Sequence, residues 1–240
     1  MMGRLRVTAL QLPARFGAVR QQLAFAEALL ESGPATDLVL LPEASLTGYL
    51  SPEGDFDLTP FAEPPDGPTA AAFQHLARRF DCLVAGPLIE RAGDCCFNAL
   101  VGYRPDESNL FHYRKRHPWF PEEWATPGAE PGALALWRGA TLLPALCYDG
   151  HFLEQEAADR LDAAGLLLFA SAWVDASDSM LPLLAGLAGD HQLSVLNANW
   201  GRGQPRVQGQ GGSLFLDASG ALVARLGLEP GRLDAVLPLF

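Results

Sequence analysis

The stretch TLLPALCYDGHFLEQ, Thr141–Gln155, decides the fold. It begins with a short apolar run, Leu142–Leu146, which is typical of a buried strand and ends at Cys147. Turn-prone residues follow, and a helical pattern begins near Phe152. We therefore expect Cys147 at the end of a strand, next to a helix N-terminus whose partial positive charge favours a thiolate. Ligands of open α/β folds bind at this end of the strands, so Cys147 is a candidate catalytic residue, the alternative being a buried structural cysteine.

The rest of the chain predicts short strands separated by a few helices. Strands are expected at residues 5–12, 37–41, 82–89, 97–103, 110–113, 134–137, 142–146, 166–171, 194–197, 213–216, 221–226 and 233–237, and helices at residues 17–32, 68–80, 152–164 and 178–191. Strand–helix–strand steps alternate with hairpins, which predicts a mixed sheet, or two packed sheets with helices outside. No repeat or linker divides the chain, so we expect one α/β domain over residues 1–240.

The composition excludes several classes of protein. The chain has 240 residues and a formal net charge of −11, which is poorly suited to neutralising nucleic-acid phosphates. No apolar run approaches the roughly 18–20 residues of a membrane span. Of the 4 cysteines, two are adjacent, and no disulfide or zinc-binding spacing occurs. We expect a cytoplasmic protein without nucleic-acid or membrane partners.

Two further residues have the chemistry that a reactive cysteine needs. Glu43 follows the apolar strand predicted at residues 37–41, where partial desolvation would raise its pKa toward that of a general base. The alternative is that it caps a loop or pairs with an arginine. Lys115 follows another strand. A cation there could lower the pKa of a nearby cysteine and hold an oxyanion, the alternative being a solvated basic strand end.

Three stretches carry these residues, in this order along the chain: LPEASLTGY with Glu43, YRKRHPWFPEEWATPG with Lys115 and LCYDGHFLE with Cys147. Together they resemble the nitrilase superfamily of carbon–nitrogen hydrolases, whose catalytic residues are Glu, Lys and Cys in that chain order. The later stretches 198–201 and 211–213 resemble that family's Asn-x-x-Gly and Gly-x-Ser stretches. The resemblance implies a four-layer α-β-β-α sandwich with two mixed β-sheets, in a single carbon–nitrogen hydrolase domain.

The middle stretch is most similar to the amidase branch. There the lysine is followed by a Pro-Trp-x-Pro run and a second glutamate before Pro-Gly. Trp119 occupies the tryptophan position, and Glu123 is expected to be the second glutamate. Its neighbour Glu122 is expected to be exposed.

The resemblance also implies a mechanism, which is hydrolysis of a small amide to a carboxylate and ammonia through a cysteine thioester. Glu43 would take the proton of Cys147, which attacks the carbonyl carbon. Lys115 and the backbone N–H of Tyr148 would hold the oxyanion, and Glu123 would orient Lys115 and the substrate nitrogen. No cofactor is implied, and the family is usually dimeric or larger, which implies a homodimer or larger homo-oligomer.

Some residues depart from the family pattern. His151 stands where many members have an arginine that holds a substrate carboxylate, which favours a neutral or differently anchored substrate. With His117 it lacks a third ligand, so no metal site is expected. Trp173 follows the strand predicted at residues 166–171 and either lines the acyl pocket or packs in the core. Gly186, in a late helix often used for subunit contacts, leaves the oligomer open.

Three alternatives stay open at this point. The same catalytic set could act on a carbamoyl compound or on a nitrile. The chain could also be a degenerate member that binds a ligand or partner. Buried charged residues cost several kcal/mol of desolvation per ion, which argues against a scaffold without activity. Residues 201–212 form either a mobile lid or an ordinary connection.

Overall fold

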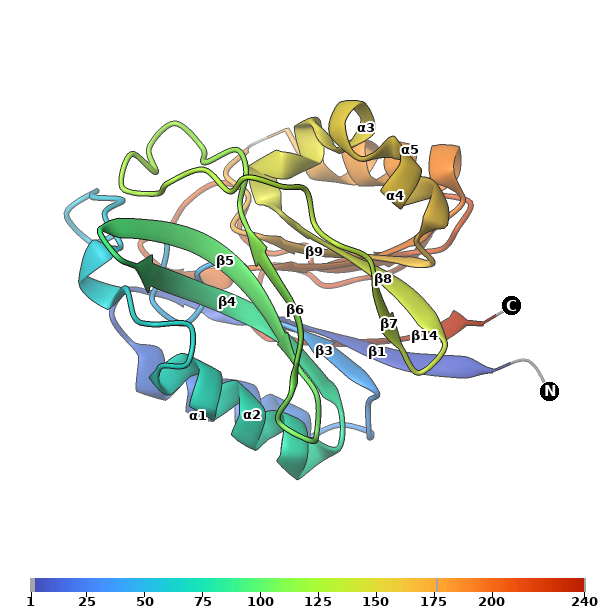
Figure 1. The fold of residues 1–240 in the computed structure, drawn as a ribbon, viewed down its shortest axis with the longest axis horizontal. Coiled ribbons are helices and arrows are strands. Elements are labelled where there is room, and N and C mark those ends of the chain that lie inside the picture. The colour runs from blue at the N-terminus through green and yellow to red at the C-terminus, as the bar shows by residue number, and fades with distance from the viewer. Residues whose placement is uncertain (1–2, 176, 240) are drawn as a thin grey trace.

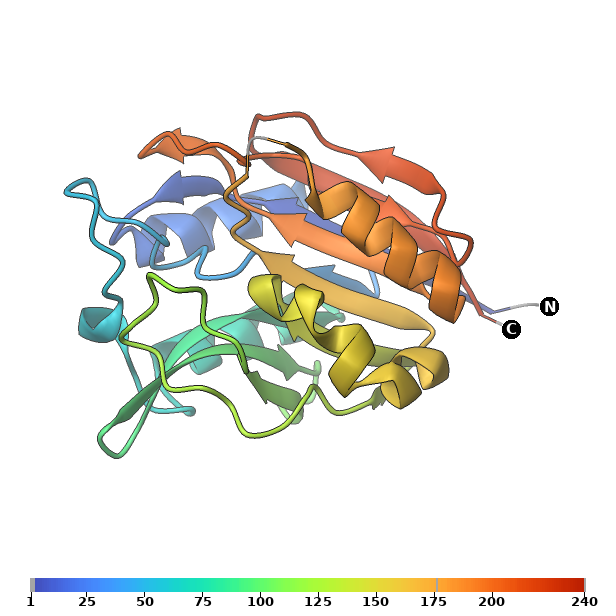
Figure 2. The same cartoon turned by 90° about the horizontal axis from the view of Figure 1, so that it is seen from above.

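The computed structural model describes residues 3–175 and 177–239. Two mixed six-stranded sheets pack face to face, and helices cover both outer faces (Figures 1 and 2). The first sheet has the order β14 (Gly231–Pro238), β1 (Arg4–Gln11), β3 (Leu38–Leu40), β4 (Leu83–Ala92), β5 (Cys95–Tyr103) and β6 (Asn109–Arg114). The second has the order β13 (Leu222–Arg225), β12 (Leu214–Leu216), β10 (Ser194–Asn199), β9 (Leu166–Ser171), β8 (Ala140–Leu146) and β7 (Ala135–Trp137).

Helices α1 (Val19–Glu31) and α2 (Pro68–Phe80) cover the first sheet. The second sheet is covered by α3 (Leu153–Glu156), α4 (Ala158–Ala163) and α5 (Met180–His191). This arrangement confirms the expected α-β-β-α sandwich with two mixed sheets. Each described helix is too short or too polar to span a membrane.

The centre of each sheet is parallel, and its strands are buried on both faces. In the first sheet β1, β3 and β4 are parallel, and in the second β8, β9 and β10 are parallel. Strands of this kind appear in a sequence as continuous apolar runs rather than as alternating ones. Leu40 and Leu142 pack in the apolar layer between the sheets, whereas Val39 and Leu143 face the helical layers.

The helix predicted at residues 152–164 is interrupted, which corrects that expectation. The chain leaves β8 through a 3-10 turn, Cys147–His151, and then forms α3 and α4 with a break at Ala157. Leu153, Ala157 and Leu161 are nevertheless all buried, at 4%, 1% and 0% exposure. The apolar spacing therefore predicted correctly which residues are buried, although the backbone is not one continuous helix.

The glycine-rich segment predicted as a loop contains a strand. Residues Gly201–Gln204 form β11, which pairs in parallel with β2 (Pro13–Arg15). A Cβ at Gly203 would lie only 2.0 Å from the carbonyl oxygen of Ala14, so glycine permits this close pairing.

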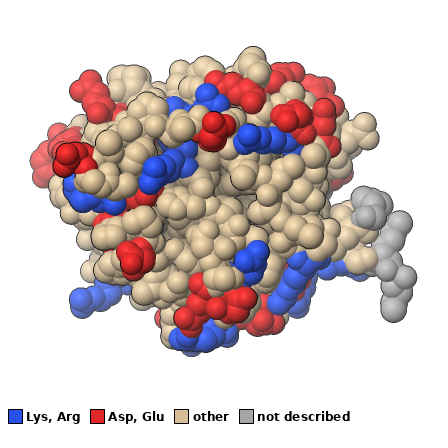
Figure 3. All heavy atoms as spheres, viewed as in Figure 1, with Lys and Arg blue, Asp and Glu red and all other residues tan. Residues whose placement is uncertain are grey.

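Charged side chains of both signs are interspersed on the face shown in Figure 3, mostly toward its edges. The described atoms on that face form no extended basic stripe of the kind that tracks nucleic-acid phosphates.

Candidate active site

The three residues expected to carry the chemistry converge at one end of the two sheets. Glu43 follows β3, Lys115 follows β6 directly, and Cys147 follows β8 directly. All three are buried, at 1%, 1% and 8% exposure. Strands from both sheets therefore bring together groups that are far apart in the sequence.

The ammonium group of Lys115 lies between two carboxyl groups. Its Nζ donates hydrogen bonds to Glu43 Oε1 at 2.7 Å and to Glu122 Oε2 at 2.6 Å. Burial alone would lower the pKa of Lys115, but attraction to Glu43 and Glu122 outweighs burial and raises that pKa above its ordinary value. Lys115 is consequently protonated at neutral pH.

Asn98 completes this group and was missed by the sequence analysis. Its Nδ2 donates to Glu43 Oε1 at 2.9 Å and to Glu122 Oε1 at 2.7 Å. It lies on β5, next to the chain that carries Lys115, whose N–H donates to the Asn98 carbonyl at 2.8 Å. The available signal was one amide side chain in an otherwise apolar strand, because a buried polar group requires partners.

Glu122 and not Glu123 is the glutamate that contacts Lys115, which corrects the expected placement of both residues. Glu122 is 2% exposed and contacts Lys115, whereas Glu123 is exposed. A tight turn folds the Glu122 carboxylate back, so that it also accepts the N–H of Trp119 at 2.6 Å. Burial raises the pKa of Glu122, Lys115 lowers it, and Glu43 raises it again, with a net increase. Neighbouring loop residues point in different directions, and the spacing of the motif alone did not show which one turns inward.

Cys147 has a strained backbone conformation. Its φ of 40° lies in the left-handed region, which non-glycine residues seldom occupy and which carries backbone strain. The turn is fixed from below by Asp149, which accepts the hydroxyl of Tyr113 at 2.6 Å and the backbone N–H of His117 at 2.8 Å. These bonds hold the Cys147 side chain at the tip of the turn.

The expected thiolate is not supported by the environment of Cys147. Burial raises the pKa of its thiol well above the ordinary value, and the Glu43 carboxylate raises it further, while Lys115 opposes both. A single 3-10 turn follows Cys147 where a longer helix was expected, so the helix-dipole argument loses its basis. The environment of Cys147 therefore favours the neutral thiol over the thiolate. Glu43 is held beside it by the N–H of Ala172, at 3.0 Å from Oε2.

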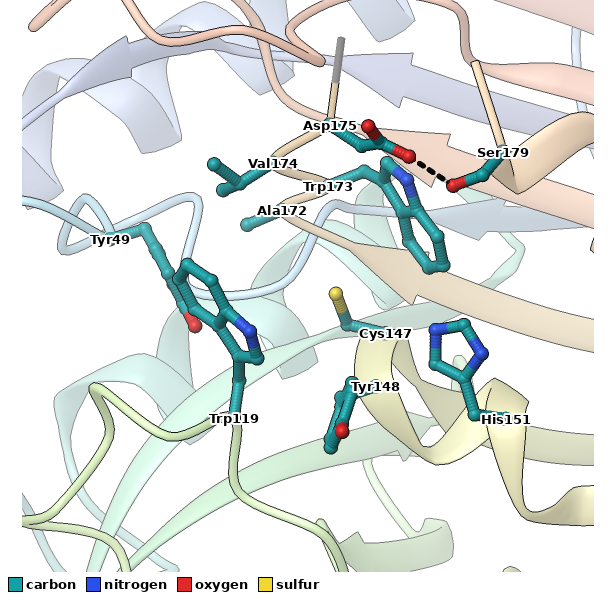
Figure 4. A pocket seen from close by; sticks show the side chains of 10 residues that line it. All are labelled: Tyr49, Trp119, Cys147, Tyr148, His151, Ala172, Trp173, Val174, Asp175 and Ser179. Atoms are coloured by element: carbon teal, nitrogen blue, oxygen red, sulfur yellow. Dashed lines mark hydrogen bonds between the residues drawn. The ribbon is translucent and has the colours of Figure 1, made fainter. Parts of the chain in front are cut away.

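A cavity of about 260 Å³ lies above these groups (Figure 4). It is lined by Tyr49, Trp119, Cys147, Tyr148, His151, Ala172, Trp173, Val174, Asp175 and Ser179. Figure 4 shows the Cys147 sulfur among these side chains, in the space between Trp119 and Trp173. The four expected binding residues, Trp119, Tyr148, His151 and Trp173, all line the cavity.

The sequence analysis missed Tyr49 and Asp175 as lining residues. Tyr49 belongs to the quoted LPEASLTGY stretch, and its ring stacks on Trp119 at a centroid distance of 6.3 Å. Among residues 3–175 and 177–239, no group of His, Cys, Asp and Glu side chains is placed to hold a metal ion.

A sandwich of this kind, with a buried glutamate, lysine and cysteine beneath a small cavity, defines a nitrilase-like hydrolase. The chain belongs to the carbon–nitrogen hydrolase family, whose model matches residues 6–236. It is therefore an enzyme that acts on non-peptide C–N bonds.

Two sequence relatives point to the amidase type within this family, and a solved structure matches the fold. The chain is 29% identical to the omega-amidase YafV of Yersinia enterocolitica over 99% of this chain and 91% of that protein. It is 26% identical to the 2-oxoglutaramate amidase of Bacillus subtilis (strain 168), over 97% of this chain and 90% of that protein. Its fold matches a mutant amidase from Nesterenkonia sp. AN1 in complex with acrylamide, with a TM-score of 0.84 and 22% identity, covering 98% and 91% of the two chains.

Proposed function

We propose that this enzyme hydrolyses a small non-peptide amide to a carboxylate and ammonia through a thioester on Cys147. The observation that carries the proposal is the buried set of Glu43, Lys115, Glu122 and Asn98 beside a thiol that lines a small cavity. The cavity, at about 260 Å³, is smaller than the roughly 300–1,000 Å³ typical of pockets for drug-sized ligands, which favours a short acyl group.

The first half of the reaction forms the thioester. Glu43 takes the thiol proton as the Cys147 sulfur bonds to the carbonyl carbon, which avoids the need for a free thiolate in a buried site. The negative oxygen that forms is held by the Lys115 ammonium and the backbone N–H of Tyr148. Each such donor is worth about 10²–10³ in rate. The intermediate then expels ammonia, to which Glu43 returns its proton.

The second half releases the acid. Glu43 accepts a proton from water as the water oxygen attacks the thioester carbon. Collapse of this second intermediate breaks the C–S bond, releases the carboxylic acid and returns the proton to the sulfur. Glu122 and Asn98 act as positioning residues, because Glu122 holds Lys115 and Asn98 holds both carboxyl groups.

The test is ammonia release from acetamide, butyramide, pentanamide and hexanamide, with Cys147→Ala as the control. We expect ammonia release by the wild type only. When the reaction is quenched in acid, the mass of the Cys147 peptide should increase by the mass of the acyl group. If hydroxylamine is added, the thioester should yield a hydroxamate at the expense of the carboxylate. Equal ammonia release by both proteins, or none by either, would overturn the proposal.

A further inference from the structure

The cavity above Cys147 combines aromatic walls with one carboxylate. Tyr49, Trp119, Tyr148 and Trp173 contribute aromatic rings, and Asp175 contributes the acidic group. In Figure 4 Asp175 lies beside Trp173, and its carboxylate is bonded to Ser179. Among the described residues, no lysine or arginine lines this cavity.

The Asp175 carboxylate is fixed in place but has no cationic partner in the described part of the chain. It accepts the N–H of Ser177 at 2.9 Å, the hydroxyl of Ser177 at 2.6 Å, and the hydroxyl of Ser179. These hydrogen bonds lower the pKa of Asp175 to about 2, so it is ionised at any working pH. The nearby Arg225 is paired instead with Asp178, at 2.6 Å.

The buried groups beneath the cavity contribute no net positive charge that could attract a substrate carboxylate. The Lys115 ammonium is shared between the carboxyl groups of Glu43 and Glu122. His151 lines the cavity, and no guanidinium lies beside it among the described lining residues. A carboxylate on the substrate would therefore meet the like charge of Asp175 without a compensating guanidinium, and like charges placed together select against a ligand.

On the basis of the function proposed above, we infer that this enzyme prefers amides whose acyl group carries an ammonium group, with Asp175 as the residue that determines this specificity. Aromatic faces attract cations through their quadrupoles, most strongly when the cation is partly desolvated. Asp175 supplies the opposite charge at the same cavity. The scissile amide then lies against Cys147, and the length of the acyl chain matches the distance from Cys147 to the ammonium site.

The test compares three amides of nearly equal length: 4-aminobutanamide, pentanamide and glutaramate. They differ only in a terminal ammonium, methyl or carboxylate group. We expect kcat/KM for the ammonium compound to exceed that for pentanamide by about tenfold, the size of a partly desolvated cation–aromatic contact, and glutaramate to be the poorest. The ω-amino amides from 3-aminopropanamide to 6-aminohexanamide locate the best chain length.

Two variants identify the residue responsible. Asp175→Asn keeps hydrogen-bonding groups at the same place but removes the charge, and should lower the ammonium-to-methyl ratio of kcat/KM by up to about fivefold, the contribution of one partly exposed ion pair. Asp178→Asn is the matched control, because it removes the same charge three residues away, where Arg225 already neutralises it. The ratio for this control should stay near the wild-type value. In the wild type, added salt should reduce the ratio by screening.

The outcomes separate the inference from the function beneath it. A wild type that hydrolyses pentanamide at least as well as every ω-amino amide would overturn the inference and leave the amidase function intact. A ratio that is equal in wild type and Asp175→Asn, or insensitive to salt, would also overturn it. Failure to hydrolyse any amide of either series would instead overturn the proposed function.

Discussion

The group around Lys115 and the cavity above it are built in different ways. Lys115, Glu43 and Glu122 have almost no exposed side-chain surface, and each is bonded to the others or to Asn98. The cavity is lined by aromatic rings, with a partly exposed aspartate and an exposed histidine. In the group around Lys115 only one arrangement pairs every charge, because an unpaired buried charge is costly. The cavity lining tolerates substitution, since its polar groups can still reach water.

This difference predicts which changes affect folding and which affect only the choice of substrate. Changes below Cys147 should reduce chemistry, and some should also reduce stability. Changes above it should alter ratios between substrates. The following experiments test that separation.

The largest effect is expected for Lys115→Ala. It leaves two buried carboxyl groups without their cation, which should lower the free energy of unfolding by about 3–5 kcal/mol and abolish hydrolysis. Urea unfolding and ammonia release measure the two effects. Arg116→Ala is the control, because the neighbouring Arg116 forms only a partly exposed pair with Glu156 at 3.3 Å, and should cost less than about 1 kcal/mol. Equal destabilisation by both variants would contradict the comparison.

Glu43→Gln should lower kcat by about 10²–10⁴, because a glutamine cannot take the Cys147 proton. The glutamine oxygen can still accept from Lys115 and Asn98, so the loss of stability should be smaller than for Lys115→Ala. Combining Glu43→Gln with Cys147→Ala should cost little more than Cys147→Ala alone, since residues that act as a unit are not additive. Multiplied losses in the double variant would show that Glu43 acts independently of the cysteine.

The two adjacent glutamates give the most direct test of the corrected assignment. Glu122→Gln should lower kcat/KM by about 10²-fold, the scale of one weakened oxyanion donor, because Lys115 loses part of its support. The matched variant Glu123→Gln changes an exposed side chain and should leave kcat/KM within about twofold of the wild type. A larger loss for Glu123→Gln than for Glu122→Gln would restore the assignment made from the sequence.

This pair of residues also shows what could be predicted from the sequence. Continuous apolar runs such as Leu166–Ser171 predicted the central strands, because a strand buried on both faces consists mostly of apolar residues. The ends of such strands predicted the places of Glu43 and Cys147. The choice between Glu122 and Glu123 depended on one turn in a loop, which no periodicity records.

Other features were missed for a related physical reason. Asn98 is polar on a buried strand, and its partners come from Glu43 and Glu122, which are 55 and 24 residues away. The state of the Cys147 thiol depends on burial and on Glu43, both of which are set by the tertiary fold. The sequence could place the chemical groups but not their electrostatic environment.

The raised pKa of Cys147 predicts its behaviour toward iodoacetamide. The raised pKa keeps the neutral thiol dominant at neutral pH, so alkylation of Cys147 should be slower at pH 7 than that of free cysteine. It should continue to accelerate above the pH at which free cysteine levels off. Mass spectrometry of the Cys147 peptide between pH 6 and pH 11 measures this profile. A plateau below neutral pH would show a stable thiolate and remove the need for Glu43 as the base.

The smallest effect is expected at the opening of the cavity, for His151→Arg. His151 is exposed, and an ion pair with a substrate carboxylate in such a place is worth up to about 1 kcal/mol, or about fivefold in kcat/KM. The variant should therefore raise the glutaramate-to-pentanamide ratio by up to about fivefold, and its free energy of unfolding should stay within about 0.5 kcal/mol of the wild type. His151→Gln, which changes shape without adding a fixed charge, should leave the ratio near its starting value. If His151→Arg instead abolished hydrolysis of pentanamide as well, the cavity and the buried group would not be separable, and the contrast between them would fail.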